Sequence, residues 1–387
     1  MKIVLFTNSL EGGGAERAAA TLANFWASQG WEVTLLTLSS QDADFYRLDA
    51  RVGRIALHLS DESGNVLQAL WHNLRRVKAL RRTLLQVQPD VALSLMSTPN
   101  VLLAFAARGL PGLAVIGSEH DYPPHAPLGS IWTALRSAMY GRLAAVVALT
   151  QETARWLESN SSARRIAVIP NATVWPLPKQ APSISPASLV LAARKVLLAV
   201  GRLTTVKNFN VLIEAFSSLA IDHGDWDLVI LGEGPQRAAL EAAIGARGLD
   251  RRILMPGIAG NVGDWYELAN LYVMTSRSEG FPNTLAEALA HGLPAVSVDC
   301  DTGPRDIVRH EIDGLLVPPE DSPALVAALD RLMGDADLRA AMGARAVDAR
   351  QRFSVEHVSS RWEQLFNDLR RPRLGLTAPS QTPTASR

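Results

Sequence analysis

Two carboxylates stand eight positions apart in the segment SEGFPNTLAEALAHG, which runs from Ser278 to Gly292. Glu279 follows the apolar run LANLYVMTS, which predicts a strand. Glu287 lies inside NTLAEALAHG, whose spacing predicts a helix that ends at Gly292. One carboxylate is therefore expected before a loop, and the other about one turn inside the following helix. A pair of solvated surface glutamates is the alternative interpretation.

The expected start of this helix suits an anion. Pro282 fits the first helical turn, and Asn283 or Thr284 fits the first position. The free main-chain amides from Phe281 to Thr284 then point toward a space that Glu287 can also reach. Amides at a helix amino terminus favour negative charge, so the segment predicts an anion site beside a carboxylate.

Two cations follow an apolar run in the segment AVGRLTTVKN. Arg202 comes directly after the predicted strand, and Lys207 stands five residues later, before a helix. A guanidinium and an ammonium together can neutralise a diphosphate without a metal ion. Two surface cations on a solvated loop are the alternative.

A run of three glycines, Gly12 to Gly14, opens the first predicted helix in TNSLEGGGAER. Bare amides of Gly13 and Gly14 at a helix amino terminus suit an anion, although a plain tight turn would have the same composition. The dinucleotide pattern G-x-G-x-x-G would require glycine at the position of Arg17. The run therefore argues against a nicotinamide-dependent oxidoreductase.

Apolar and amphipathic runs alternate in two similar halves of the chain, from KIVLFT to AAVVALT and again from KVLLAVG onward. This βαβα rhythm predicts an α/β fold with parallel, doubly wound sheets, which bind ligands at their strand carboxyl ends. We expect a first domain over 1–173, a linker over 174–190 and a second domain over 191–353. A helix over 354–370 is expected to pack back on the first domain, and 371–387 to be disordered.

Composition sets the broad class of the protein. The chain has 387 residues, a formal net charge of zero and 48% apolar residues, which describes a globular protein without bulk preference for nucleic acid. The single cysteine, Cys300, permits no internal disulfide and suits a reducing compartment. No apolar run reaches the roughly 18 residues of a membrane span, so a cytoplasmic location is expected.

The ordered set GRLTTVKN, the two spaced glutamates and HGLPAVSVDCDTGPRDIV…DGLLVPPED resembles the retaining glycosyltransferases of family 4, which have the GT-B fold. The resemblance covers nearly the whole chain. GGGAER and GSEHDYP resemble the subgroup that elongates lipid-linked oligosaccharides and exopolysaccharides of the amylovoran type. The resemblance implies two Rossmann-like domains that face each other across a cleft, an acceptor-binding domain over 1–173 and a nucleotide-sugar-binding domain over 191–353.

The resemblance also implies roles for individual residues. Arg202 and Lys207 would bind the donor diphosphate, Glu279 the donor sugar and Glu287 the ribose hydroxyls. His120 in SEH matches a histidine on the sugar and acceptor side of the cleft. The remaining donor-binding positions that it implies are Gly13, Gly14, Gly201, Phe281, Pro282, Asn283 and Thr284.

The implied reaction transfers a sugar with retention at the anomeric carbon, and cations would stabilise the charge on the leaving diphosphate. No cofactor or metal is expected. The acidic triplets Asp42–Asp44, Asp299–Asp301 and Asp335–Asp337 could hold a metal, but only the second follows a strand. The resemblance to the subgroup implies a UDP-sugar donor, with UDP-N-acetylhexosamines as the favoured class. A sugar-nucleotide 2-epimerase of the same fold and a non-catalytic sugar-nucleotide-binding subunit remain as alternatives.

The segment WHNLRRVKALRRTLLQ carries five cations and no acid. On a helix, Arg75, Lys78 and Arg82 share one stripe beside Trp71. An apolar arc that would dock on the core comprises Leu74, Val77, Leu80, Leu84 and Leu85. The implied acceptor is a polyprenyl-diphosphate-linked saccharide, so we expect the stripe to contact its diphosphate or anionic headgroups on the inner face of the cell membrane. A solvated basic face is the alternative.

Overall fold

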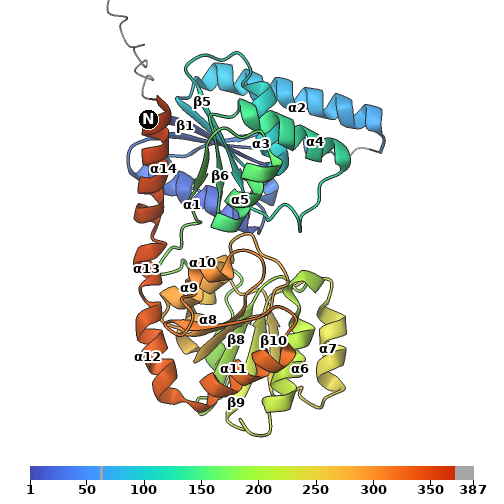
Figure 1. Cartoon of the computed structure of the whole chain (residues 1–387), viewed down its shortest axis with the longest axis vertical. Coiled ribbons are helices and arrows are strands. Elements are labelled where there is room, and N and C mark those ends of the chain that lie inside the picture. The colour runs from blue at the N-terminus through green and yellow to red at the C-terminus, as the bar shows by residue number, and fades with distance from the viewer. Residues whose placement is uncertain (62–63, 371–387) are drawn as a thin grey trace, which may run out of the picture.

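The structure is a computed structural model, and it describes residues 1–61 and 64–370 of the chain. Two α/β bodies are stacked along the long axis of the molecule, and a series of helices runs down one side of both (Figure 1). Each body has a parallel sheet of its own, which confirms the predicted pair of doubly wound domains. The expected disorder at 371–387 concerns a segment outside the described residues.

Within the described residues, the first sheet has seven parallel strands in the order β3-β2-β1-β4-β5-β6-β7. Their bounds are β1 (Lys2–Thr7), β2 (Glu32–Thr37), β3 (Gly53–Ala56), β4 (Val91–Leu95), β5 (Ala114–Glu119), β6 (Ala145–Ala148) and β7 (Ile166–Val168). The apolar runs predict five of these strands. They miss β3 and β7, because short edge strands bury too few residues to leave an apolar run.

Helices cover both faces of this sheet, which is why its central strands are continuously apolar. Their bounds are α1 (Gly14–Ser28), α2 (Val66–Val87), α3 (Ser97–Ala106), α4 (Ser130–Met139) and α5 (Gln151–Asn160). Ile3 and Leu5 of β1 face the core beneath α1, and Val4 and Phe6 face the core beneath α2, α3 and α5.

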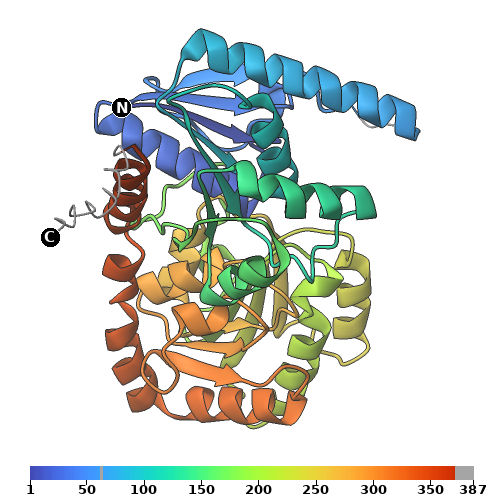
Figure 2. The same ribbon diagram turned by 45° about the horizontal axis from the view of Figure 1, so that its top comes forward.

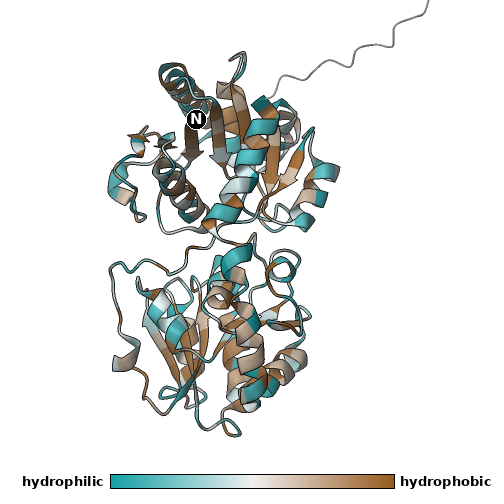
Figure 3. Cartoon of the chain, turned by 90° about the vertical axis from the view of Figure 1, so that its left-hand side faces the viewer, coloured by the Kyte–Doolittle hydropathy of each residue, from teal (hydrophilic) through white to brown (hydrophobic). Residues whose placement is uncertain are grey.

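The second sheet is parallel, with the order β10-β9-β8-β11-β12-β13 over the described part of the chain. The strands are β8 (Lys195–Val200), β9 (Trp226–Leu231), β10 (Ile253–Gly257), β11 (Leu271–Met274), β12 (Ala295–Val298) and β13 (Gly314–Val317). Their helices are α6 (Phe209–Leu219), α7 (Arg237–Gly245), α8 (Val262–Leu268), α9 (Asn283–Ala290), α10 (Pro304–Ile307), α11 (Ser322–Gly334), α12 (Ala336–Ala346) and α13 (Ala349–Arg352). Figure 3 shows apolar strands inside both bodies.

The last helix, α14 (Val355–Arg370), returns to the first domain and packs beside α1. Trp26 of α1 lies 5.6 Å from the Phe366 ring, and its indole nitrogen donates to Ser359 Oγ at 2.7 Å. The chain therefore crosses between the domains twice, once before the second sheet and once after it.

The predicted linker, residues 174–190, packs along the surface of the second domain. Asn261 binds both main-chain groups of Ile184, at 2.8 and 3.0 Å, and Lys179 forms an ion pair with Asp264 at 2.7 Å. Leu177 is buried in the core of the second domain. The Pro- and Ser-rich composition predicts the lack of regular structure but not this packing.

Helix α2 departs from the predicted packing. Its apolar arc was expected to dock on the core as a whole, but Leu74 and Leu85 are about half exposed, at 52% and 53%. The helix contacts the core mainly through its carboxyl half, where Leu80 and Leu84 are buried. None of the helices in the described ranges combines the length and apolar character that crossing a membrane requires.

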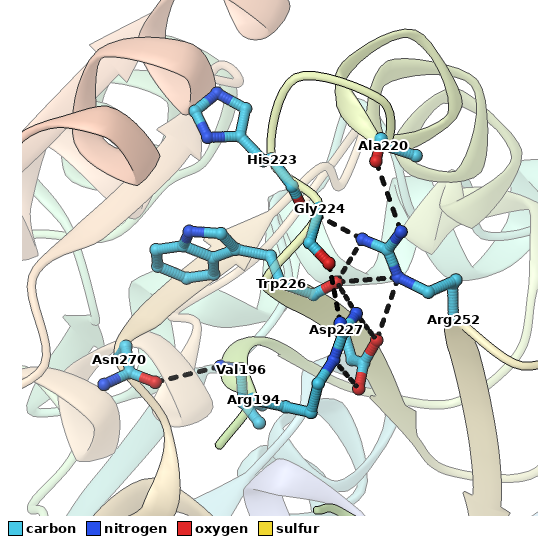
Figure 4. A network of polar contacts seen from close by, with 9 residues as sticks. All are labelled: Arg194, Val196, Ala220, His223, Gly224, Trp226, Asp227, Arg252 and Asn270. Carbon is cyan, nitrogen blue, oxygen red and sulfur yellow. Dashed lines mark hydrogen bonds and ion pairs between the residues drawn. The ribbon is translucent and has the colours of Figure 1, made fainter.

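A buried carboxylate connects three neighbouring strands at their amino-terminal ends, on the side of the second sheet away from the first domain (Figure 4). Asp227 of β9 accepts hydrogen bonds from Arg194, which precedes β8, at 2.5 and 3.0 Å. It also accepts one from Arg252, which precedes β10, at 3.0 Å. One carboxylate therefore neutralises two guanidinium groups that are themselves mostly buried.

We expect Asp227→Ala to lower the free energy of unfolding by about 3 kcal/mol, because it leaves two cations without their counter-charge. Asp225→Ala is the matched control, since its ion pair with Lys195 is about half exposed and should contribute less than about 1 kcal/mol. Urea unfolding measures both. Equal losses for the two variants would contradict the structural role of the buried carboxylate.

Candidate active site

A cavity of about 960 Å³ lies between the two domains. Its walls come from the carboxyl ends of β8 and β9, from α1 and α9, and from the segment 174–180. Strand carboxyl ends are where open parallel sheets bind ligands. Arg202, Gly201, Thr284 and Glu287 of the predicted set line this cavity directly.

The close approach of the loops after β8 and β9 requires a glycine at position 232. An ideal Cβ at Gly232, which has a φ of +147°, would lie 1.9 Å from the main-chain oxygen of Gly201. The loops after β8 and β9 are therefore in direct main-chain contact, and this contact leaves Arg202 at the cavity wall.

Lys207 is brought next to this wall and is paired. Its Nζ lies 2.5 Å from Glu279 Oε1, and its carbon chain lies against Gly201. Both charged groups are largely buried, with side-chain exposures of 25% and 10%. The structure thus joins two residues that are 72 positions apart, one predicted to bind phosphate and the other to bind sugar.

The segment before α9 differs in detail from the prediction. Pro282 stands just before the helix and not inside its first turn. The ring of Phe281 is buried, with an exposure of 7%, and packs against the ring of Phe353 at 5.6 Å. Asn283 accepts a hydrogen bond from Asn171 of the first domain at 3.1 Å, and Thr284 accepts one from Tyr272 at 2.8 Å.

Glu287 is 2% exposed and lies at the domain boundary. Its Oε1 is 2.7 Å from Arg17 Nη1 of the first domain, and its Oε2 accepts a hydrogen bond from Tyr266 at 3.3 Å. Burial raises the pKa of Glu287, while Arg17 and the Tyr266 hydroxyl oppose that rise. A carboxylate in this position can accept hydrogen bonds from vicinal hydroxyls.

The glycine run forms the amino terminus of α1 and faces the second domain. Gly13 is the residue before the helix, and an ideal Cβ there would lie 2.1 Å from a carboxylate oxygen of Glu16. An ideal Cβ at Gly14 would lie 3.2 Å from Asn283 Nδ2. The two glycines therefore allow a side chain and the facing domain to approach this helix end closely.

His120 follows β5 and is buried. Its Nε2 lies 3.2 Å from Ser118 Oγ, and Nδ1 has no hydrogen-bond partner among the described residues. Burial lowers the pKa of His120 to about 3. The imidazole is neutral at physiological pH, so it can exchange hydrogen bonds with a sugar hydroxyl but does not supply a positive charge.

Arg75, Lys78 and Arg82 lie outside this region, on the exposed side of α2. Arg75 stacks over the ring of Trp71 at 4.5 Å. None of the three cations forms an ion pair within the part of the chain that the structure describes. The three cations form an exposed stripe on α2, as predicted, but the stripe does not line the cavity.

The acidic triplets have other partners. Asp44 binds Arg54 through two hydrogen bonds, Asp335 caps α12, Asp299 pairs with Arg305 and Asp301 pairs with His125. In the described ranges, no group of three or more His, Cys, Asp and Glu side chains is arranged to hold a metal ion.

Two residues near the site were not assigned a role from the sequence, although quoted motifs contain them. Arg17 belongs to GGGAER and pairs with Glu287. Asp121 belongs to GSEHDYP, and both burial and the nearby Glu279 raise its pKa. The quoted motifs include these two residues, but their partners belong to the other domain and become visible only in the folded structure.

Comparison with known proteins identifies both halves of the chain. The family model described as Glycosyltransferase Family 4 matches residues 12–173, and the one described as Glycosyl transferases group 1 matches residues 183–348. Amylovoran biosynthesis glycosyltransferase AmsD of Erwinia amylovora is 26% identical, over 94% of this chain and 99% of its own length.

Two further relatives differ in how much of their length is matched. The GalNAc-alpha-(1->4)-GalNAc-alpha-(1->3)-diNAcBac-PP-undecaprenol alpha-1,4-N-acetyl-D-galactosaminyltransferase of Campylobacter jejuni is 27% identical, over 96% of this chain and 99% of its own. Exopolysaccharide phosphotransferase SCO2592 of Streptomyces coelicolor is 31% identical over 95% of this chain, but the chain spans only 41% of that protein.

Solved structures share the fold. Sucrose-phosphate synthase from Thermosynechococcus elongatus superposes with a TM-score of 0.81 at 20% identity, covering 95% of this chain and 98% of that one. Anabaena HepE in complex with UDP gives 0.77 at 18% identity, covering 95% and 100%. The predicted two-domain GT-B architecture is confirmed.

The burial of neutral His120 predicts a pH effect on stability. Because the pKa of His120 is lower in the folded state, the unfolded chain takes up a proton first as the pH falls. The stability that the neutral imidazole contributes is therefore fully present above the ordinary pKa of 6.5 and is lost as the pH falls toward about 3. Between pH 6.5 and 4.5, wild type should lose roughly 2 kcal/mol more unfolding free energy than His120→Gln. Urea unfolding at several pH values measures this, and parallel curves for both proteins would contradict a buried neutral imidazole.

Proposed function

The chain belongs to the family 4 glycosyltransferases of the GT-B fold, and from this premise we propose that it transfers a sugar with retention from a UDP-sugar to a lipid-linked saccharide. A UDP-N-acetylhexosamine is the proposed donor. The observation that carries the proposal is that Arg202 and Glu287 line one interdomain cavity, with the Lys207–Glu279 pair beside it.

The cavity supplies complementary groups for each part of a nucleotide sugar. Arg202 and Lys207 suit the diphosphate, and Glu287 suits the ribose hydroxyls, since an ionised carboxylate only accepts hydrogen bonds. Ile258, Ala259 and Gly260 also line the cavity and are the proposed contacts of the donor base. UDP occupies the similar fold of Anabaena HepE, which supports a uridine nucleotide here.

In the proposed reaction, the bond from the anomeric carbon to the leaving phosphate oxygen breaks as the bond to the acceptor oxygen forms on the same face. The acceptor hydroxyl gives its proton to that phosphate. Arg202 and Lys207 stabilise the negative charge that develops on the diphosphate, and Lys207 has enough donors to hold Glu279 as well. Neutral His120 and Glu279 orient the sugar by hydrogen bonds.

No metal ion takes part in this proposal, because two side-chain cations already provide the counter-charge. The proposed reaction also requires the domains to close, which brings His120 and the acceptor of the first domain to the donor held by the second domain. Closure also excludes water, which would otherwise hydrolyse the donor.

The acceptor proposal rests on two observations. The Erwinia and Campylobacter relatives are named for amylovoran biosynthesis and for an undecaprenol-linked acceptor, respectively. Helix α2 extends from the first domain (Figure 2) and presents exposed apolar side chains beside its three cations. These apolar side chains are Val66, Leu67, Leu70, Trp71 and Leu74. We propose that this helix rests on an anionic membrane, where cations attract headgroups and apolar side chains enter the interface.

The function is tested first by donor choice. Thermal shift with UDP-, GDP- and ADP-sugars should select a UDP-sugar, and transfer to a polyprenyl-diphosphate-linked saccharide should give a product with the donor's anomeric configuration by NMR. Arg202→Ala and Lys207→Ala should each lower turnover about 100-fold, and chelator should have little effect. An inverted product, abolition by chelator or epimerisation of the donor alone would overturn the proposal.

Membrane association is tested by flotation with anionic liposomes. Wild type should float at low salt and less at high salt. Replacement of Arg75, Lys78 and Arg82 by Ala should weaken binding by about 100-fold, from roughly 1 kcal/mol per cation. The matched control replaces three exposed arginines of the second domain, Arg247, Arg251 and Arg331, and should float like wild type. Equal flotation of both triple variants would show that the stripe on α2 does not mediate membrane binding.

A further inference from the structure

Arg17 reaches from the first domain into the donor site of the second. Its Nη1 lies 2.7 Å from Glu287 Oε1, and both side chains line the cavity that contains Arg202. Arg17 stands in the first turn of α1, directly after the glycine turn. Among the described side chains of its own domain, the Glu287 carboxylate has one hydrogen-bond partner, Tyr266, at the longer distance of 3.3 Å.

We propose that Arg17 is a positioning residue of the donor site, which holds the Glu287 carboxylate in the orientation that receives the ribose of the nucleotide. The inference rests on the function proposed above, because it assigns the cavity to a nucleoside diphosphate. It adds a residue of the first domain to a subsite otherwise built by the second.

The hydrogen-bonding capacity of the carboxylate allows Arg17 and a ribose to bind together. An ionised carboxylate offers about four acceptor positions, and it can only accept. Arg17 uses one position on Oε1 and Tyr266 uses one on Oε2. About two positions remain, which is the number that two vicinal ribose hydroxyls require.

Burial makes the arginine necessary for this arrangement. A carboxylate that is 2% exposed is costly unless a cation and hydrogen bonds compensate it. Without Arg17, Glu287 would gain a proton more readily or turn toward water, and either change removes the acceptor geometry. Tyr46 supports Arg17 from the first domain, since it lies close to the guanidinium and donates to the main-chain oxygen of Gly13 at 3.0 Å.

The position of the pair across the boundary has a thermodynamic consequence. Arg17 and Glu287 meet only when the domains are together, so the ribose subsite is complete only in the closed arrangement. Coupling between two sites is reciprocal, so a nucleotide whose ribose binds Glu287 in turn favours closure.

The test compares ribose recognition by calorimetry, with UDP, GDP and ADP and their 2′-deoxy forms as ligands. Wild type should bind one ribonucleotide about 10-fold more tightly than its deoxy form. Arg17→Ala should weaken binding of that ribonucleotide about 10- to 100-fold and bring the ribo-to-deoxy ratio close to one. Glu287→Gln should reduce the same ratio, and the double variant should add little to either single change.

Two further variants separate positioning from folding. Arg17→Lys keeps the charge without the planar guanidinium and should fall between wild type and Arg17→Ala. Arg165→Ala removes an exposed arginine of the first domain that pairs with Asp368 of α14, and it should leave the ratio unchanged. Thermal unfolding verifies that each variant is folded, and an unfolded Arg17→Ala leaves Arg17→Lys to decide the outcome.

The possible outcomes distinguish this inference from the proposed function. If wild type binds none of the nucleotides, the proposed function fails and the inference fails with it. If folded Arg17 variants bind as tightly and as selectively as wild type, the inference fails while the proposed function stands. Tighter binding by Arg17→Ala would show that Arg17 competes with the ribose, which also overturns the inference.

Discussion

Close contact between Gly280 and the main chain at His120 sets the geometry of the whole site. An ideal Cβ at Gly280 would lie 1.8 Å from the main-chain oxygen of His120, so no other residue fits while the domains hold this position. The contact brings Glu279 beside Asp121 and places the sugar end of the proposed donor site between the two sheets. Other polar contacts across the boundary depend on the same approach, including the pair of Thr150 and Thr302.

The two segments in which the chain crosses between the domains contact each other directly. The Thr173 amide donates to the Phe353 main-chain oxygen at 2.7 Å, and Arg350 stacks on Trp175 at 3.6 Å. The ring of Phe281, at the start of the donor segment, packs on Phe353. The ring of Phe281 therefore connects the segment before α9 to the second of these crossings, and its part in donor binding stays a prediction.

Charges at the cavity are compensated before any substrate is present. Lys207 is paired with Glu279 and Arg17 with Glu287. Burial raises the pKa of Glu16, and the nearby charge of Arg202 opposes that rise. Because isolated buried charges are unstable, the cationic groups of such a cavity need internal partners. The proposed nucleotide sugar would share or replace these contacts through its phosphates and hydroxyls.

The local elements and the candidate binding loops could be predicted from the sequence, since periodicity, glycine positions and helix starts depend on neighbours along the chain. The sequence thereby predicted both sheets, the cationic loop after β8 and the carboxylates around α9. The folded structure was needed to show that Arg17 faces Glu287, that burial keeps His120 neutral and that Leu74 and Leu85 of α2 stay exposed. These properties arise where segments far apart in the chain meet and exclude water, and no local spacing encodes which segments those are.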